Sequence, residues 1–452
     1  MKQIIGILIL LLFFSPIKAE EVDVASLPKL LGSSNVGREF YFTFIPAWET
    51  FHSNLKLYIS SNVRTKVLVE VSGKEYEKIK YTIPNDIIEF TLSSAIGQCY
   101  RRTDREPPEP DNVWRNAGVH IVADAPIICY AVARYMYSSD GFIALPLNVL
   151  GREYFVASFA DPVGSGTLQY LTSYTGITAA YDNTKVRFTM GGNDRSKTAS
   201  GRVPGETTVW DLDEGDVLLI GALGHHAELT GSRIVASNPV SVVSGNFCAY
   251  VPSNCGCCDL LEEMEIPTYA WGKTYHVTPI IERKKNSIIK IFAKEPYTKV
   301  YRDNEFLGII RSAGGTEGVG YLHLRADEGE PRPIVISGDK PISVTQYNTG
   351  QKDDGIESDP FQMTLLPEEL YQKEITFQTP GIRGGFGFTK NYINLCYESY
   401  VTGNLPDDLE IAFYNYTDSV FNWYKLKDTL GGTCKPFIVS DDGKQYYMTT
   451  IQ

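Results

Sequence analysis

The sequence predicts an all-β protein built from tandem β-sandwich-like modules, with a propeller-like closed array of strands as the alternative. One pattern occurs three times: an apolar stretch, Pro, an alternating strand, a variable loop, an Asp and a hydrophobic-Pro pair. Its copies lie at 118–146, 231–267 and 333–367. The chain is also rich in strand and turn residues, with 28 Tyr, 21 Phe, 39 Gly and 24 Pro, while helical periodicity is hard to find. A unit repeated along a chain indicates stacked modules.

A second recurring marker divides the chain into units. It reads GREFYFTF from Gly37, GREYFVAS from Gly151, GKTYHVTP from Gly272 and, in diverged form, QKEITFQT from Gln372. Each interval is roughly the 100 residues of a small domain. We therefore predict β modules at 37–150, 151–271 and 272–371, followed by a partial, capping β module at 372–452.

A third marker, Thr-Lys-Val, begins at Thr65, Thr184 and Thr298 and opens stretches in which apolar and polar residues alternate. Alternation with period two is typical of a half-buried strand. Seven or so strands in a unit of roughly 100 residues fit a β-sandwich. Two four-stranded propeller blades per unit would satisfy the same count, so both architectures stay open.

The N-terminus resembles a secretory signal peptide, 1–19, in which Lys2 precedes the apolar run Ile4 to Phe14 and cleavage falls near Ala19. No later segment is long and apolar enough to be a transmembrane helix, which predicts a secreted, extracellular or cell-surface protein. The formal charge is −12 and no basic block is present. This argues against a nucleic-acid partner, which would require clustered Lys and Arg.

The segment Pro239 to Val277, PVSVVSGNFCAYVPSNCGCCDLLEEMEIPTYAWGKTYHV, resembles the N-terminal domain of the IgG-Fc-binding protein family. The matching pieces include Ser244-Gly245-Asn246, Cys258-Asp259-Leu260 and Trp271-Gly272, and the flanking markers extend the likeness over most of 37–380. The resemblance implies a bacterial-type secreted or surface adhesion protein that binds a partner without catalysis. The third unit departs from the pattern, since it has no cysteine and no Trp-Gly.

Eight cysteines in an exported chain favour disulfides. Cys248 with Cys258 would close the loop after the second Pro-centred strand. Cys396 with Cys434 and Cys99 with Cys129 are the further pairs we predict, although sequence does not fix connectivity. The alternative is a zinc site formed by Cys255, Cys257 and Cys258, but their spacing is not that of usual zinc ligands and no His lies nearby.

Three aligned acids, Asp140, Asp259 and Asp359, stand just before the hydrophobic-Pro pairs. They could cap turns through their side-chain oxygens or form a ligand site that repeats in each module. No cofactor is predicted, but calcium is possible in the most acidic loop, whose spacing is not that of an EF-hand. The candidate calcium ligands are Asp353, Asp354, Glu357 and Asp359.

Aromatic and Arg side chains in the variable loops are candidates for ligand binding, since such residues dominate binding hot spots. The candidates are Arg134, Tyr135, Tyr137, Phe247 and Tyr250. The alternative is that the Tyr rings complete the hydrophobic core.

No serine-hydrolase elbow, zinc-protease helix or phosphate loop is present, so no catalytic residue is predicted. The function that we predict is adhesion to an extracellular protein or glycan. A structural subunit of a surface layer or appendage, with self-association, is the alternative, and a carbohydrate-active enzyme is a third, less favoured possibility.

Overall fold

The computed structural model describes most of the three predicted units and parts of the C-terminal one. The described residues are 35–48, 54–161, 169–253, 255, 258–326, 329–372, 392–398, 409–415, 417–418, 420–426, 428, 435–436 and 446–451. The predicted signal peptide, 1–19, lies outside them. Within the described residues no helix is long and apolar enough to cross a membrane.

Nearly all regular structure is β, which confirms the predicted fold class of tandem β modules. The first sheet contains β1 (Val36–Phe42), β2 (Asn54–Ser60), β3 (Lys66–Val71), β4 (Tyr76–Tyr81), β5 (Ile87–Leu92), β7 (Val119–Arg134) and β8 (Ser139–Ile143). The second contains β6 (Asn112–Trp114), β9 (Gly151–Phe155), β10 (Ser173–Ala179), β11 (Thr184–Thr189), β12 (Thr207–Leu212), β13 (Val217–Gly221), β14 (Arg233–Ala249) and β15 (Asp259–Met264).

The third sheet contains β16 (Gly272–Val277), β17 (Ile288–Ala293), β18 (Thr298–Arg302), β19 (Glu305–Ile310), β20 (Tyr321–Arg325), β21 (Ile334–Tyr347) and β22 (Gln362–Thr364). It has the same spatial order of strands as the first, with β19-β18-β21-β17-β20 corresponding to β4-β3-β7-β2-β5. Beyond it lie a three-stranded sheet of β23 (Ile393–Glu398), β26 (Lys435–Pro436) and β27 (Tyr446–Ile451), and a hairpin of β24 (Glu410–Asn415) and β25 (Val420–Lys425).

Within the described residues, helical structure is limited to single turns. These are η2 (Ser72–Lys74), α2 (Ser94–Gly97), η3 (Leu147–Val149), η4 (Thr268–Ala270), η5 (Gln351–Asp353) and η6 (Glu368–Leu370).

Each of the first three sheets is organised around one long strand, β7, β14 or β21. In the first sheet Val122 pairs with both Glu39 of β1 and Leu68 of β3, so these two strands lie on opposite edges of β7. The second half of β7 pairs with β2 and β8 instead. β9, β11, β10 and β15 pair with β14 in the same way, as do β16, β18, β17 and β22 with β21.

The Pro of the repeated pattern marks an interruption in each long strand. The partner strands β1, β9 and β16 skip the residues around Pro126, Pro239 and Pro341, where their register shifts. Proline has no N–H to donate to a ladder, so a bulge is where a sheet tolerates it. What the sequence indicated as an apolar stretch followed by a separate strand is therefore one continuous strand with a bulge.

The opening Gly and the closing Pro of each unit contact one another. A Cβ added to Gly37, Gly151 or Gly272 would lie 2.2, 2.3 or 2.5 Å from the Cβ of Pro146, Pro267 or Pro367, respectively. Only Gly permits this close approach. In each unit the Gly of the opening marker therefore lies against the Pro of the closing hydrophobic-Pro pair, so the first strand of the unit packs beside its end.

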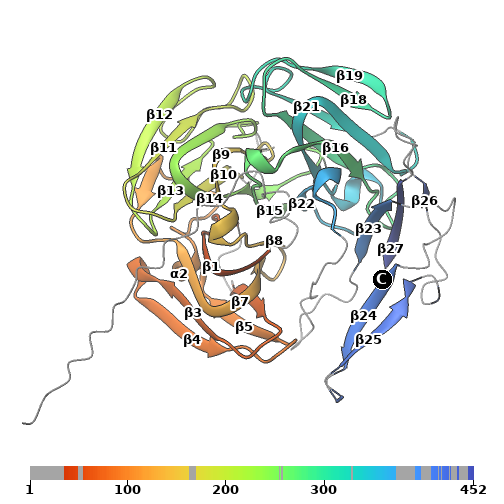
Figure 1. Cartoon of the computed structure of the whole chain (residues 1–452). Helices are drawn as coiled ribbons and strands as arrows, with labels where there is room; N and C mark the ends of the chain where they lie inside the picture. Colours follow the sequence, from red (N-terminus) through yellow and green to blue (C-terminus); the bar gives the residue numbers. More distant parts are fainter. Residues whose placement is uncertain are drawn as a thin grey trace, which may run out of the picture.

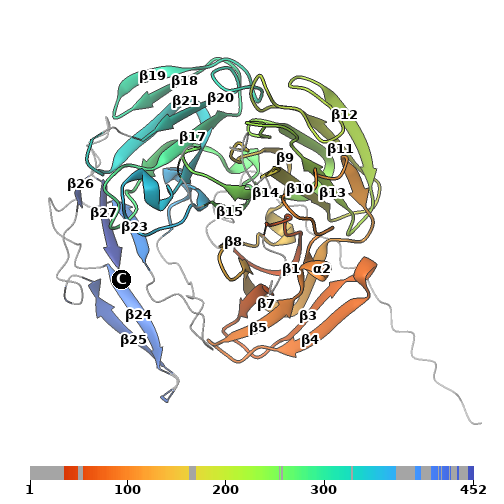
Figure 2. The same ribbon diagram turned by 180° about the vertical axis from the view of Figure 1, so that it is seen from behind.

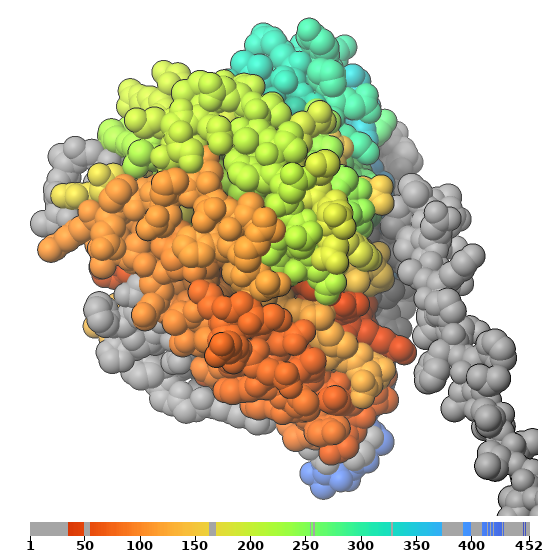
Figure 3. Space-filling view, turned by 90° about the vertical axis from the view of Figure 1, so that its left-hand side faces the viewer, coloured from red at the N-terminus to blue at the C-terminus, as the bar shows by residue number. Residues whose placement is uncertain are grey.

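The three sheets surround a common centre, with β8, β15 and β22 inside and β4, β12 and β19 outside (Figures 1 and 2). The second and third sheets have cores of their own, whereas the first core extends from Phe42 and Phe44 to Tyr174 and Val243 of the second unit. These two units form one continuous surface in Figure 3. Because β6 precedes residue 151 yet pairs with β13, the boundaries drawn from the markers stay predictions.

Candidate ligand-binding face

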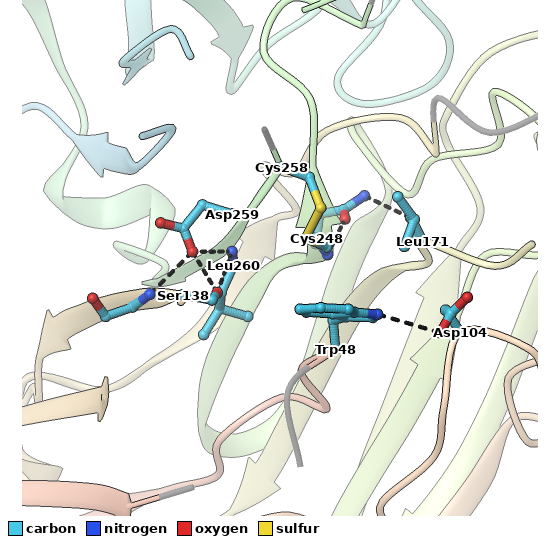
Figure 4. Close-up of a disulfide and its surroundings, with 10 residues drawn as sticks. Trp48, Asp104, Ser138, Leu171, Cys248, Cys258, Asp259 and Leu260 are labelled. Atoms are coloured by element: carbon cyan, nitrogen blue, oxygen red, sulfur yellow. Dashed lines mark hydrogen bonds between the residues drawn. A yellow bond between two sulfur atoms is a disulfide. The ribbon is translucent and has the colours of Figure 1, made fainter. Parts of the chain in front are cut away.

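The loops that follow the three long strands meet at the centre of the molecule. We call residues 135–138, 250–253, 255, 258 and 348–361 the loop face. Ser138 Oγ and Ser139 N donate hydrogen bonds to Asp259 Oδ1, which joins the first loop to the end of the second (Figure 4). Gly350 N donates to Val251 O at 2.8 Å, which joins the second loop to the third. Three segments far apart in sequence therefore form one surface.

A disulfide between Cys248 and Cys258, with an S–S distance of 1.96 Å, closes the second loop (Figure 4). This is the pair that the sequence favoured. Beneath it, the buried Asn246 side chain accepts a hydrogen bond from Cys248 N at 2.8 Å and donates to Phe159 O and Leu171 O. The loop is therefore anchored by a covalent bond and by buried hydrogen bonds.

Reduction of the Cys248–Cys258 disulfide is expected to lower the melting temperature. A cross-link over about ten residues removes roughly 2 to 3 kcal/mol of unfolded-state chain entropy. Differential scanning calorimetry of the wild type with and without reductant measures the effect, and the Cys248→Ser/Cys258→Ser variant should no longer respond. An unchanged melting curve after complete reduction of the wild type would contradict a stabilising role.

Of the other cysteine pairs predicted from sequence, Cys99 with Cys129 was wrong. Cys99 and Cys129 are separate, buried free thiols, and burial raises the pKa of Cys99 to about 12. Cys99 follows α2 whereas Cys129 lies within β7, and the sequence could not show that their side chains do not meet. Cys396 forms no disulfide among the described residues, and because Cys434 lies outside them, the Cys396–Cys434 pair stays a prediction.

The zinc alternative is not supported by the geometry. Cys258 is committed to the disulfide, Cys255 is a buried free thiol, and Cys257 lies outside the described residues. A sulfur in a disulfide is not a thiolate ligand.

The predicted calcium ligands do not converge either. Asp353 accepts hydrogen bonds from Arg325 at 3.0 Å, and these outweigh burial and lower the pKa of its carboxyl. Asp354 is paired with Arg283 at 2.9 Å and accepts a bond from Lys284 N. Glu357 and Asp359 lie further along the loop and are exposed. Among the described residues, no group of three or more His, Cys, Asp or Glu side chains could hold a metal ion.

The aligned acids Asp140 and Asp259 bind backbone amides at the centre. Asp140 accepts hydrogen bonds from Gly141 N at 2.8 Å, Glu262 N at 2.9 Å and Gln362 N at 3.5 Å, so one side chain contacts all three units. Asp259 accepts from Ser139 N and Leu260 N. These contacts agree with the interpretation that the acids cap backbone amides. For Asp140, however, two of the three amides, those of Glu262 and Gln362, belong to the second and third units. Asp359 contributes its main-chain oxygen, which accepts a bond from Asn348 Nδ2.

Further carboxyls are buried around this centre without a nearby cation. Glu262 is fully buried and accepts a bond from Ile45 N at 2.6 Å, and Glu265 is 4% exposed and accepts one from Ala157 N at 2.7 Å. Burial raises the pKa of Glu265 to about 8 and that of Glu262 well above its usual range, because the charged form loses its hydration. The middle of the protein therefore holds neutral acids at mildly acidic pH.

The aromatic residues predicted to bind a ligand divide into two groups. Tyr137 is 74% exposed on the loop face. Tyr135 is 7% exposed and its hydroxyl accepts a hydrogen bond from Gln98 Nε2 at 2.8 Å. Phe247 is fully buried, with the Arg102 guanidinium 4.0 Å from its ring centroid. For Tyr135 and Phe247 the core alternative holds, because both rings pack into the hydrophobic core that the first and second units share. Arg134 and Tyr250 are half-buried.

Two exposed apolar residues were missed by the sequence analysis. Met136, beside Tyr137, is 50% exposed. Trp48 is 37% exposed; its Nε1 donates to Asp104 Oδ1 at 3.2 Å and its main-chain N donates to Phe247 O, next to Cys248 (Figure 4). Trp48 lies outside the repeated markers, so none of them singled it out. Trp48 and Tyr137 thus lie at the two ends of the disulfide-closed loop.

Comparison with known proteins gives one family. The profile of the family described as IgGFc binding protein matches residues 140–435. The human IgGFc-binding protein is 27% identical over 347 residues, which cover 74% of this chain but only 6% of the human protein. No solved structure matches the chain. The relative is human, so nothing in these matches supports the expected bacterial type. Because the matched region covers more than half of its residues, the chain belongs to the IgGFc-binding protein family.

Proposed function

We propose that this chain is an extracellular, non-catalytic binding module whose loop face contacts a protein ligand. The observation that carries the proposal is the convergence of three loops on one surface, with Tyr137 and Trp48 exposed at the two ends of the loop closed by Cys248–Cys258. Exposed aromatic side chains on a rigid support are what binding hot spots require.

The links among the described residues of the loop face support this proposal. The disulfide fixes the second loop, Asp259 fixes the first loop against it, and Gly350 N fixes the third. A pre-organised surface loses less conformational entropy on binding, so more of the contact energy appears as affinity. The name of the human relative points to the Fc part of immunoglobulin G as the first ligand to test, and glycans remain an outcome of the same experiment.

The test is a protein and glycan array, including purified IgG Fc, probed with residues 20–452. Replacing Tyr137 or Trp48 by Ala is expected to weaken binding by tenfold or more, since a hot-spot aromatic contributes about 2 kcal/mol. Tyr181→Ala is the matched control, because Tyr181 is 43% exposed but lies in the β10–β11 turn beside the bend of β14. Equal affinity of all three variants and the wild type would refute the loop face as the binding surface.

Self-association, as expected of a surface-layer or appendage subunit, is the second candidate. It is the alternative that the sequence left open. Size-exclusion chromatography with light scattering separates the two, because a ligand receptor should stay monomeric whereas a structural subunit should assemble with concentration.

A further inference from the structure

The hairpin of β24 and β25 contains an acceptor motif for N-linked carbohydrate. Asn415, Tyr416 and Thr417 match the pattern Asn-x-Ser/Thr in which x is not Pro. No other Asn in the sequence stands two residues before a Ser or Thr. The pattern has a chemical meaning only in an exported chain, and the N-terminus that resembles a signal peptide predicts export. One position in the chain is therefore a candidate for this modification.

The motif lies at the turn of the hairpin, where a modifying enzyme can reach it. Asn415 is the last residue of β24 and pairs with Val420, the first residue of β25. Thr417 and Asp418 lie within the turn and are exposed, and the hairpin extends away from the three complete sheets (Figure 1). A group attached at such a turn displaces no core side chain.

The Asn415 side chain bonds to residues of its own turn. Its Oδ1 accepts a hydrogen bond from Thr417 N at 2.9 Å, and its Nδ2 donates to Asp418 Oδ2 at 2.9 Å. The first bond brings the acceptor amide close to the Thr of the motif. The second involves an exposed carboxylate, which can turn to solvent, and Nδ2 carries two hydrogens. The amide nitrogen is therefore available for a new bond.

Aromatic side chains on the hairpin provide a surface for the first sugar. Side chains two residues apart on a strand share a face, so Phe413 lies on the same face as Asn415. Their cross-strand partners, Asn422 and Val420, lie on that face as well. Phe413 is 57% exposed, and its ring centroid is 6.1 Å from that of Tyr424, which is 46% exposed. A sugar linked to Asn415 would cover this apolar surface and remove it from water.

We propose that Asn415 carries an N-linked oligosaccharide, attached while the chain passes through the secretory pathway. The donor is a lipid-linked oligosaccharide diphosphate. Asn415 Nδ2 forms a bond to the anomeric carbon of the first sugar, and the bond from that carbon to the phosphate oxygen breaks. Nδ2 loses one proton as the lipid diphosphate leaves, and neither reactant is oxidised or reduced. The proposal does not depend on the loop face.

The test uses the full chain, 1–452, secreted from cultured eukaryotic cells. Digestion with peptide-N-glycosidase in heavy-oxygen water should remove one glycan from the wild type, seen as a shift in gel mobility, and leave a labelled Asp in place of Asn415. Asn415→Gln and Thr417→Ala should show no shift, whereas Thr417→Ser preserves the motif and should retain the glycan in a measurable fraction. Asn422→Gln is the matched control, because Asn422 is an exposed Asn of the same hairpin without the motif.

Carbohydrate is added before the chain folds, so cell lysates report on any variant that is not secreted. Secretion of the wild type without carbohydrate would overturn the proposal. So would a shift that persists in Asn415→Gln, a shift that is lost in Asn422→Gln, or the absence of glycan from Thr417→Ser. A wild-type chain that never enters the secretory pathway would overturn it as well, because the modification requires export.

Discussion

Substitution of Lys290 by Met is expected to destabilise the junction of the second and third sheets by about 3 to 5 kcal/mol, the cost of leaving one charge of a buried pair without its partner. Lys290 is 1% exposed on β17, and its Nζ lies 2.7 Å from Glu228 Oε2 and 2.7 Å from Ser158 O, both in the second unit. In the variant the Glu228 carboxylate would stay buried without a cation.

The surroundings of Lys290 make a compensating rearrangement difficult. Thr230 Oγ1 and Tyr321 OH also donate to Glu228, and the rings of Phe159, Tyr321 and Tyr347 surround the ammonium with centroids 4.8 to 5.6 Å from Nζ. Despite burial, the charge and hydrogen bonds of Lys290 and Thr230 lower the pKa of Glu228, so its carboxyl is ionised in the folded protein.

Urea denaturation of Lys290→Met, Glu228→Gln/Lys290→Met and Lys185→Met tests this prediction. The double variant removes both charges and should recover much of the lost stability. Lys185 forms an exposed pair with Asp211 at 2.6 Å, so its substitution should stay within about 0.5 kcal/mol of the wild type. If Lys290→Met unfolds at the same urea concentration as Lys185→Met, the buried pair does not stabilise the junction.

Stability is expected to fall as pH rises from about 4.5 to about 8. The raised pKa of Glu265, about 8, means that the folded protein keeps this proton while the unfolded chain loses it near its ordinary pKa of 4.5. The free energy of unfolding then decreases by up to about 1.4 kcal/mol per pH unit for such a carboxyl across this window. Above pH 8 this contribution no longer changes.

The Glu265→Gln variant isolates this effect. Its amide oxygen can still accept the bond from Ala157 N, and it has no charge to bury. Urea midpoints measured from pH 5 to pH 8 should fall less for the variant than for the wild type, and at pH 8 the variant should be at least as stable. Parallel pH profiles for the two proteins would show that the buried carboxyl does not titrate as predicted.

Deprotonation of His120 is also expected to lower stability as pH rises, so its contribution must be distinguished from that of Glu265. Its ring nitrogens bond to Glu70 at 2.8 Å and Glu39 at 3.1 Å; burial opposes its charge, but these carboxylates outweigh burial and raise its pKa. Its stabilisation is present at low pH and lost as pH rises through the raised pKa. Since His120 is unchanged in Glu265→Gln, the difference between the two profiles reports on the carboxyl.

The repeated markers predicted more of the fold than composition could. Gly37, Gly151 and Gly272 each lie against the closing Pro of their own unit, so the spacing of these residues in sequence reflects a contact in space. The alternating residues after Thr65 and Thr184 form β3 and β11, as predicted. What the markers could not show is that Pro126 lies within one continuous strand, because a bulge and a strand end look alike in sequence.

The candidate site was predicted only in part. The disulfide followed from the compartment and from local spacing, and Tyr137 was identified as a loop aromatic. Tyr135 and Phe247 could not be told from it. Tyr135 lies in the same loop as Tyr137, Phe247 lies near the end of β14, and only packing against neighbouring segments decides which ring is covered. The acidic loop around Asp353 and Asp354 suggested a cation site. The sequence did not show that Arg325 and Arg283, which lie on other segments, neutralise these two carboxylates.

By itself the sequence determined the class of the fold and made Cys248–Cys258 the favoured disulfide, because both depend on local periodicity or spacing. Only the tertiary structure decided the Lys290–Glu228 pair, the neutral acids at the centre and the free thiols of Cys99 and Cys129. Each of these depends on which surface meets which neighbour. Alternation of apolar and polar residues in the sequence shows which side chains of a strand share a face. It does not show which neighbouring element that face packs against.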